Sequence, residues 1–216
     1  SRELAEEIER LGAGINAGSG SDTTSVAASA LSIYASRILE MMAEMILRPS
    51  FPEDELDLFR RNTIESLKFQ RSQAGFLADE QTARIIFGDH PYSRVSPTAA
   101  DIEKLTRERL QDYHKRAFIP NNAVFIAVGD IQKDEFIAEL NSVFGQWKPG
   151  ESVIREFDAP PTRSKRTVTI VDRKGSAQAN IVLANPAIER SHPDYFSVLV
   201  MNQILGAGAS SRIFMN

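Results

Sequence analysis

The hydrophobic positions of the first 50 residues predict a helix, a hairpin and a second helix. Residues 2–11 show helical periodicity, which ends at Gly12. Residues 13–31 carry small, β-tolerant side chains around Gly18-Ser19-Gly20-Ser21-Asp22, a pattern typical of two strands joined by a turn. Apolar residues recur at helical spacing over residues 33–47. The methionines of that stretch favour a place in the core over a cofactor site.

The middle of the chain is mainly helical in pattern. Ser50-Phe51-Pro52-Glu53 predicts a capping box with proline in the first turn of a helix that runs to about residue 72. A further helix is predicted over 76–87, and Gly88-Asp89-His90-Pro91-Tyr92 ends it in a loop. Thr98 with Asp101 predicts the start of a short helix.

The pattern changes after Pro120. Thr106 with Glu108 predicts the start of the last helix before Pro120. Residues 123–128 then form an apolar run of strand length. An amphipathic helix follows and ends at Gly145. The prolines, glycine and charges of residues 146–164 are typical of an inter-domain linker.

A second unit is predicted from about residue 165. Residues 167–171 and 178–183 alternate as two strands. Ser191 and Asp194 then predict the cap of an apolar helix that runs to residue 205, and residues 206–209 break it.

The composition excludes several classes of function. With 216 residues and 42% hydrophobic content, the chain can form one core and part of a second. Its 25 basic and 29 acidic residues give a net charge of −4, which opposes general attraction to nucleic acid. No apolar run suggests a membrane span, and no signal peptide is expected. The absence of Cys removes disulfides, thiolate ligands and cysteine nucleophiles.

No residue pattern predicts a complete catalytic centre. A catalytic zinc takes three protein ligands, often including two His at i and i+4, whereas His90, His114 and His192 are isolated. We interpret the three as surface, loop-packing or capping residues. The sequence Gly18-Ser19-Gly20 lacks the strand-elbow-helix context of a serine nucleophile. Gly206-x-Gly208 follows a helix, which is the wrong context for dinucleotide binding.

Four short sequence elements occur in a fixed order over nearly the whole chain. They are Glu7-x-x-x-Leu11-Gly12-Ala13-x-Ile15-Asn16-Ala17, Phe87-x-x-His90-Pro91-Tyr92-x-Arg94, Asn121-Asn122-Ala123-x-x-x-Ala127-x-Gly129-Asp130, and Leu205-Gly206 with Ser211-Arg212-Ile213-Phe214. In this order and at these intervals they resemble the pitrilysin/insulinase family of metallopeptidases, which includes the mitochondrial processing peptidase and the core proteins of respiratory complex III.

The resemblance implies an α+β fold, in which an antiparallel sheet is layered by helices and homologous domains close like a clam shell around an unfolded peptide. Residues 1–150 would be a peptidase-like domain without its first segment, 151–164 a linker, and 165–216 the start of a second homologous domain. The family's zinc motif, His-x-x-Glu-His, lies upstream of the matched part. We therefore expect the chain to be a fragment that is inactive alone and contains no cofactor. The zinc would be that of other family members or of a partner subunit.

The third zinc ligand of the family adds a second expectation. Family enzymes carry two Glu seven residues apart, on one face of a helix that precedes the Phe-x-x-His-Pro loop. Counting back from His90 places these positions on Phe59 and Ser66, and a serine hydroxyl is a poor zinc ligand. The resemblance thus implies a degenerate zinc site. In the alternative register the parent protein would bind zinc through Glu65, with Leu58 in place of its mate.

Two further features match residues that bind substrate in the family. Asn16 and Ala17 match an edge strand that pairs with extended substrate through backbone hydrogen bonds, and the alternative is an ordinary hairpin. Arg212 matches an arginine of the opposite lobe, which acts with a downstream Tyr in binding substrate and stabilising the developing oxyanion. The alternative for Arg212 is a surface cation of a helix.

Three functions remain open from the sequence. The first is an inactive subunit that supplies the Arg/Tyr lobe and half of the peptide chamber to a homologous zinc-bearing partner in a heterodimeric peptidase. The second is a piece of an active zinc endopeptidase whose metal motif lies upstream. The third is a structural or peptide-binding scaffold. The compartment is not fixed by the residues, although the resemblance admits the cell envelope or periplasm.

Overall fold

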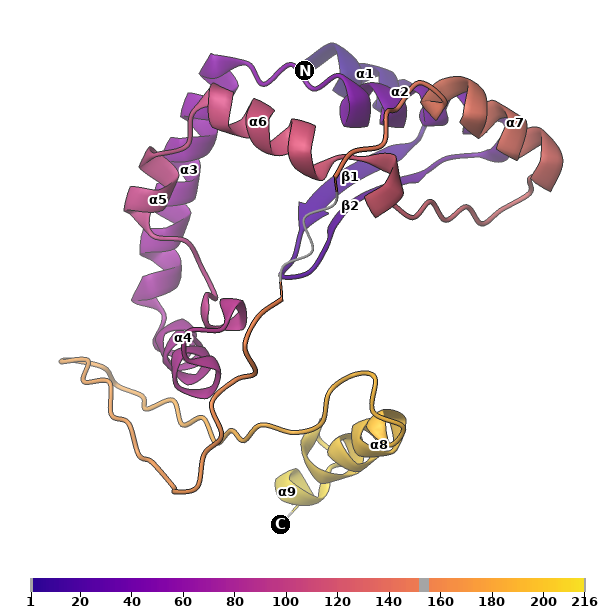
Figure 1. Ribbon diagram of the computed structural model, residues 1–216. Coiled ribbons are helices and arrows are strands. Elements are labelled where there is room, and N and C mark those ends of the chain that lie inside the picture. Colours follow the sequence, from indigo (N-terminus) through magenta and orange to yellow (C-terminus); the bar gives the residue numbers. More distant parts are fainter. Residues whose placement is uncertain (1, 152–155, 216) are drawn as a thin grey trace. The chain divides into compact units, whose positions relative to one another are not determined.

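The computed structural model describes residues 2–151 and 156–215, which form two compact units (Figure 1). The first unit is Ser1–Gly175 and the second is Ser176–Asn216. Residues 1, 152–155 and 216, which belong to the predicted domains and linker, lie outside the described residues. The division into 1–150, 151–164 and 165–216 therefore stays a prediction.

The first unit begins with the predicted helix, hairpin and helix. They are α1 (Arg2–Arg10), β1 (Gly14–Ser19), β2 (Thr24–Ser29), the short 3-10 helix η1 (Ser32–Tyr34) and α2 (Ala35–Leu47). The strands pair antiparallel, with Gly14 opposite Ser29 and Ser19 opposite Thr24. The turn between α1 and β1 uses Gly12 at φ 59°, a conformation that favours glycine. The predicted hairpin is confirmed.

The core of this part lies on α2. Ile38, Met41 and Met42 form a buried cluster, and Met41 is only 2% exposed. Partly buried apolar residues from α1, the following turn and the hairpin pack against the cluster: Leu4, Ile8, Leu11, Ala13, Ile15, Val26 and Ala28. Flexible methionine side chains suit such an irregular junction of two helices and a hairpin. The prediction that the methionines belong to the core is confirmed.

Helices dominate the rest of the first unit, and α5 lies alongside α3 (Figure 1). They are α3 (Glu53–Ser72), α4 (Ala74–Phe87), the 3-10 helix η2 (Pro91–Ser93), α5 (Ala99–Glu103), α6 (Arg107–Ala117), the 3-10 helix η3 (Pro120–Asn122) and α7 (Lys133–Phe144). The helices predicted to 72, over 76–87 and before Gly145 are present with small shifts in their bounds.

The predicted capping box at the start of α3 is wrong. The N-cap is Pro52, and no side chain bonds to the first helical amides. Phe51 has φ 46°, which is rare for a bulky residue, and the chain turns there. The Ser50 carbonyl instead accepts a hydrogen bond of 3.0 Å from Arg107 Nη2. This bond joins α6 to the segment before α3, and the first amides of α3 have no side-chain cap.

The predicted cap of α5 is confirmed, and it gives a pH-dependent prediction. The Thr98 hydroxyl and backbone amide donate to Asp101, and these bonds hold the pKa of Asp101 below its ordinary value. A carboxyl with a lowered folded-state pKa stabilises the fold above its unfolded pKa and loses this contribution as the pH falls. We expect Thr98→Ala to lower Tm by about 3 °C at pH 7, and by less as the pH falls below about 4. Thermal melts across pH, with Thr98→Ser as the conservative control, check this; a pH-independent difference would contradict it.

Three predicted strands are absent from the described residues. Residues 123–128, 167–171 and 178–183 have no strand pairing. Within the first segment, Val124, Ile126 and Val128 are 86%, 79% and 94% exposed, while the Phe125 ring lies 6.0 Å from that of Phe136 on α7. The prediction for this segment rests on an apolar run of strand length, but a strand also needs a hydrogen-bonded neighbour. The described residues provide none beside these segments.

The second unit contains α8 (Tyr195–Gly206) and α9 (Arg212–Met215). The helix predicted up to residue 205 is present, and it ends where glycine was expected to break it. Gly208 adopts φ 131° in the connection between the two helices. With its helices and the antiparallel pair β1–β2, the chain has the predicted α+β fold.

Candidate functional site

The free edge of β1 carries the two residues expected to contact a peptide. Asn16 lies opposite Ala27 and Ala17 opposite Val26, and both Asn16 and Ala17 are exposed. Among the described residues, β1 pairs only with β2, so its other edge has no strand beside it. Small side chains allow another backbone to approach such an edge. The position suits strand addition, while the contact itself stays a prediction.

The tip of the hairpin is joined to a loop far away in the sequence. The Tyr92 hydroxyl donates a hydrogen bond of 2.7 Å to Asp22 Oδ1. This bond and the negative charge of Asp22 raise the pKa of Tyr92. The Tyr92 ring lies 4.7 Å from that of His90 and 5.6 Å from that of Phe87. Because 70 residues separate the bonded pair, no local sequence signal predicted this contact.

The helix α3 carries the two positions that the sequence predicts to match the family's paired glutamates, and that match stays a prediction. Phe59 and Ser66 lie two turns apart on one continuous helix and hence on one face. Phe59 is 54% exposed, and Ser66 is exposed as well. Glu65 forms an exposed ion pair with Lys68, whose Nζ lies 2.6 Å away. An aromatic ring and a hydroxyl do not fit the zinc that the family's glutamates serve.

The three histidines make local structural contacts. His90 Nδ1 accepts a hydrogen bond from the Tyr92 amide at 3.2 Å, and His192 Nδ1 accepts one from the Asp194 amide at 3.1 Å. His114 Nε2 lies 2.6 Å from the Ile46 carbonyl oxygen at the end of α2. These contacts confirm the interpretation of the histidines as capping and packing residues.

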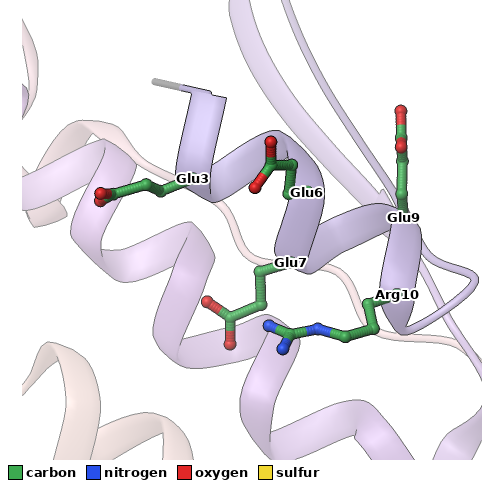
Figure 2. A pocket seen from close by; sticks show the side chains of 5 residues that line it. All are labelled: Glu3, Glu6, Glu7, Glu9 and Arg10. Atoms are coloured by element: carbon green, nitrogen blue, oxygen red, sulfur yellow. The ribbon is translucent and has the colours of Figure 1, made fainter.

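A shallow pocket on α1 is lined by acidic side chains whose carboxylates do not converge on a common position. Its lining consists of Glu3, Glu6, Glu7, Glu9 and Arg10, and Figure 2 shows the side chains of Glu3 and Glu9 pointing in different directions. Glu7 Oε1 is paired with Arg37 Nη2 at 2.6 Å. In the part of the chain that the structure describes, no group of three or more His, Asp or Glu side chains could hold a metal ion.

A buried carboxylate ties α3 to α4. Glu80 on α4 is 9% exposed, and its Oε1 lies 3.1 Å from Arg71 Nη2 at the end of α3 and 3.4 Å from Arg84 Nη2. The Ser96 hydroxyl donates to the same oxygen at 3.3 Å. The spacing of Glu80 and Arg84 is visible in the sequence, whereas the contact with Arg71 depends on the turn between the helices.

Arg212 belongs to the second unit and is described there on its own. It is the first residue of α9 and is exposed. Among the described residues of the second unit, none forms an ion pair or hydrogen bond with its guanidinium. Arg212 is therefore accessible for binding. This accessibility fits a residue that contacts substrate, and it fits an ordinary surface cation equally well.

Comparison with known families assigns both parts of the chain. Residues 1–94 match the family model described as Insulinase (Peptidase family M16), and residues 104–216 match the one described as Peptidase M16 inactive domain. The chain belongs to the M16 peptidase family. The predicted resemblance is thus confirmed, and the second match identifies an M16 domain of the inactive type.

Relatives of the M16 chain come from bacteria and from eukaryotes. One is named uncharacterized zinc protease YmxG of Bacillus subtilis, which is 23% identical over 216 residues, covering 100% of this chain and 52% of the relative. Another is a probable mitochondrial-processing peptidase subunit beta of Schizosaccharomyces pombe, 25% identical over 207 residues, which are 94% of this chain and 45% of the relative. The chain spans about half the length of these relatives.

Solved structures support the same fold. A peptidase M16 inactive domain from Pseudomonas fluorescens has a TM-score of 0.77 at 25% identity, and a protease from Helicobacter pylori has 0.73 at 19% identity. Each match covers 98% of this chain and 52% of the other. None of the helices within the described ranges is both long and apolar enough to cross a bilayer.

Proposed function

We propose that this chain is part of an M16 subunit that binds no zinc itself and supplies peptide-binding surface and Arg212 to a homologous zinc-bearing partner. The observation that carries the proposal is the face of α3 where family enzymes have two carboxylates. Here that face presents Phe59 and Ser66. The match to an inactive-type domain concerns residues 104–216 and therefore the lobe of Arg212, whereas α3 lies in the part that matches the Insulinase model.

Peptide or protein is the substrate class in this proposal. The free edge of β1 offers backbone donors and acceptors beside Asn16 and Ala17, a mode of recognition that tolerates many sequences. Arg212 is exposed and unpaired in the described part of the second unit. A cation of this kind suits a substrate carbonyl on which negative charge develops. In the assembled peptidase Arg212 would act in trans on substrate held at the partner's metal.

The names of several relatives favour a second candidate, an active zinc endopeptidase with its metal motif outside these residues. YmxG, for example, is called a zinc protease. In that case Glu65 would serve as the carboxylate ligand of α3. Its ion pair with Lys68 at 2.6 Å would have to open first, and Leu58 would stand in place of the second glutamate.

The partner assay tests the proposal. The full-length protein is combined with its zinc-bearing homologue, and cleavage of an unfolded peptide is measured with wild type and with Arg212→Ala. We expect Arg212→Ala to lower kcat/KM about 100-fold, the usual effect of losing one group that stabilises an oxyanion. Arg173→Ala, which removes another exposed arginine, is the matched control and should leave the rate unchanged.

Two outcomes would overturn the proposal in different ways. Metal analysis that finds about one zinc per chain in the isolated full-length protein would establish the zinc endopeptidase instead. An unchanged cleavage rate with Arg212→Ala would remove the trans role of Arg212 and favour a structural or peptide-binding scaffold.

A further inference from the structure

The two ends of the β1–β2 hairpin are held by different means. At the base, Ile15, Val26 and Ala28 pack on the α2 core. Toward the tip, residues 16–25 are exposed and mostly small or polar. A two-stranded hairpin by itself is at best marginally stable in water. The outer half therefore depends on whatever holds its tip.

The turn has its own local bonds, and one bond comes from outside the hairpin. Ser19 and Thr24 share a hydroxyl hydrogen bond of 2.6 Å, and the Gly20 amide donates to the Thr23 carbonyl at 2.8 Å. Both lie within the hairpin. Among the described residues, the Tyr92 hydroxyl is the outside group that hydrogen-bonds to the turn, through Asp22.

Tyr92 is itself well held. Its backbone amide donates to His90 Nδ1 at 3.2 Å, which fixes the tight turn η2 after α4. Its ring stands edge-on to those of Phe87 and His90, and the His90 ring lies 5.7 Å from that of Phe157. A hydroxyl on a ring anchored in this way is a pre-positioned donor, and a carboxylate acceptor strengthens the bond.

We propose that Tyr92 and Asp22 form a positioning pair that holds the outer half of the hairpin, residues 18–25, and so keeps the free edge of β1 extended beyond Asn16 and Ala17, which adjoin the packed base, for an added peptide strand. This inference rests on the proposed function, in which that edge binds substrate. Strand addition gains its affinity from main-chain hydrogen bonds. An edge that is already ordered avoids the entropy loss of ordering on binding, so losing the pair should weaken peptide binding without unfolding the unit.

The test uses hydrogen exchange and peptide affinity on the full-length protein. Tyr92→Phe keeps the ring but loses the donor, and Asp22→Ala removes the acceptor. In an antiparallel pair only every second amide bonds to the partner strand, and the Gly20 amide donates to Thr23, so the amides of Gly18 and Gly20 are the ones in this half that face β2. We expect each variant to speed exchange of these two amides about 3- to 10-fold, the effect of losing one hydrogen bond. Binding of fluorescein-labelled β-casein, which lacks a stable fold, should weaken by a similar factor. The double variant should be no worse than either single variant.

Two variants separate positioning from a general effect on the fold. Asp22→Asn keeps an oxygen acceptor and should restore exchange and affinity nearly to wild type. Tyr113→Phe removes a half-exposed tyrosine hydroxyl on α6 and should change neither. Unchanged β1 exchange in Tyr92→Phe would overturn the positioning pair, and so would faster exchange that extends equally over α2. If the wild-type protein binds no casein, the proposed function is wrong. The hydrogen-exchange measurement then tests by itself whether Tyr92 and Asp22 hold the hairpin.

Discussion

Met41→Ala should lower the free energy of unfolding of the first unit by about 2–5 kcal/mol. Met41 is 2% exposed and lies between Ile38 and Met42, where α1, α2 and the hairpin meet. Removing its side chain loses the transfer free energy of the buried atoms and leaves a cavity that the neighbours fill only in part. Since the same cluster anchors the base of the hairpin, the loss should also reach β1.

The measurement is urea denaturation followed by tryptophan fluorescence. The chain has one tryptophan, Trp147, whose Nε1 donates to the Phe118 carbonyl at 2.9 Å within the first unit. Met41→Leu conserves most of the volume and should cost less than about 1.5 kcal/mol. Met201→Ala, at a methionine 54% exposed in the second unit, should leave this transition in place. Equal effects of Met41→Ala and Met201→Ala would contradict the assignment of Met41 to the core.

Elements defined by neighbouring residues could be predicted from the sequence. The hairpin, α2, α3, α4 and α7 each follow from a periodicity or a turn signal contained within the element. The missing strand at 123–128 shows the limit. The segment is the predicted apolar run of strand length, with the Phe125 ring near those of Phe136 and Phe144 on α7 and with Val124 and Ile126 exposed. Pairing, however, depends on a second segment that the pattern does not name.

The candidate site shows the same difference between residue types, which are visible in the sequence, and long-range contacts, which are not. The sequence alone shows the residue types at Asn16, Phe59 and Ser66, and their matches to family positions stay predictions. The contacts around them could not be predicted, because Tyr92 and Asp22 are 70 positions apart. The local cap signal at Ser50 also failed, because the N-cap of α3 is Pro52; the contact that Ser50 makes instead, through its carbonyl, is with Arg107, 57 residues away.

Glu80→Ala should destabilise the first unit by about 2–3 kcal/mol. Breaking a fully buried ion pair costs about 3–5 kcal/mol, but the Arg71 and Arg84 side chains are 34% and 57% exposed, so water compensates part of the loss. The variant still loses the three polar contacts to Glu80 Oε1. It also leaves the Arg71 guanidinium, whose Nε is buried without a hydrogen-bond partner among the described residues, without its carboxylate. Glu80→Gln keeps an oxygen acceptor without the charge and should fall between wild type and Glu80→Ala.

The control for Glu80→Ala is another glutamate ion pair in the same unit. Glu65 and Lys68 lie 2.6 Å apart, closer than Glu80 and Arg71, yet their side chains are 70% and 66% exposed. Because water and salt screen exposed charges, Glu65→Ala should cost at most about 0.5 kcal/mol, and 1 M salt should abolish that difference while leaving most of the Glu80 effect. Urea denaturation of the two variants at low and high salt shows whether an ion pair stabilises the fold because its charges are buried or because they are close together. Equal losses in both variants would show that the Glu80 contacts do not fix the junction of α3 and α4.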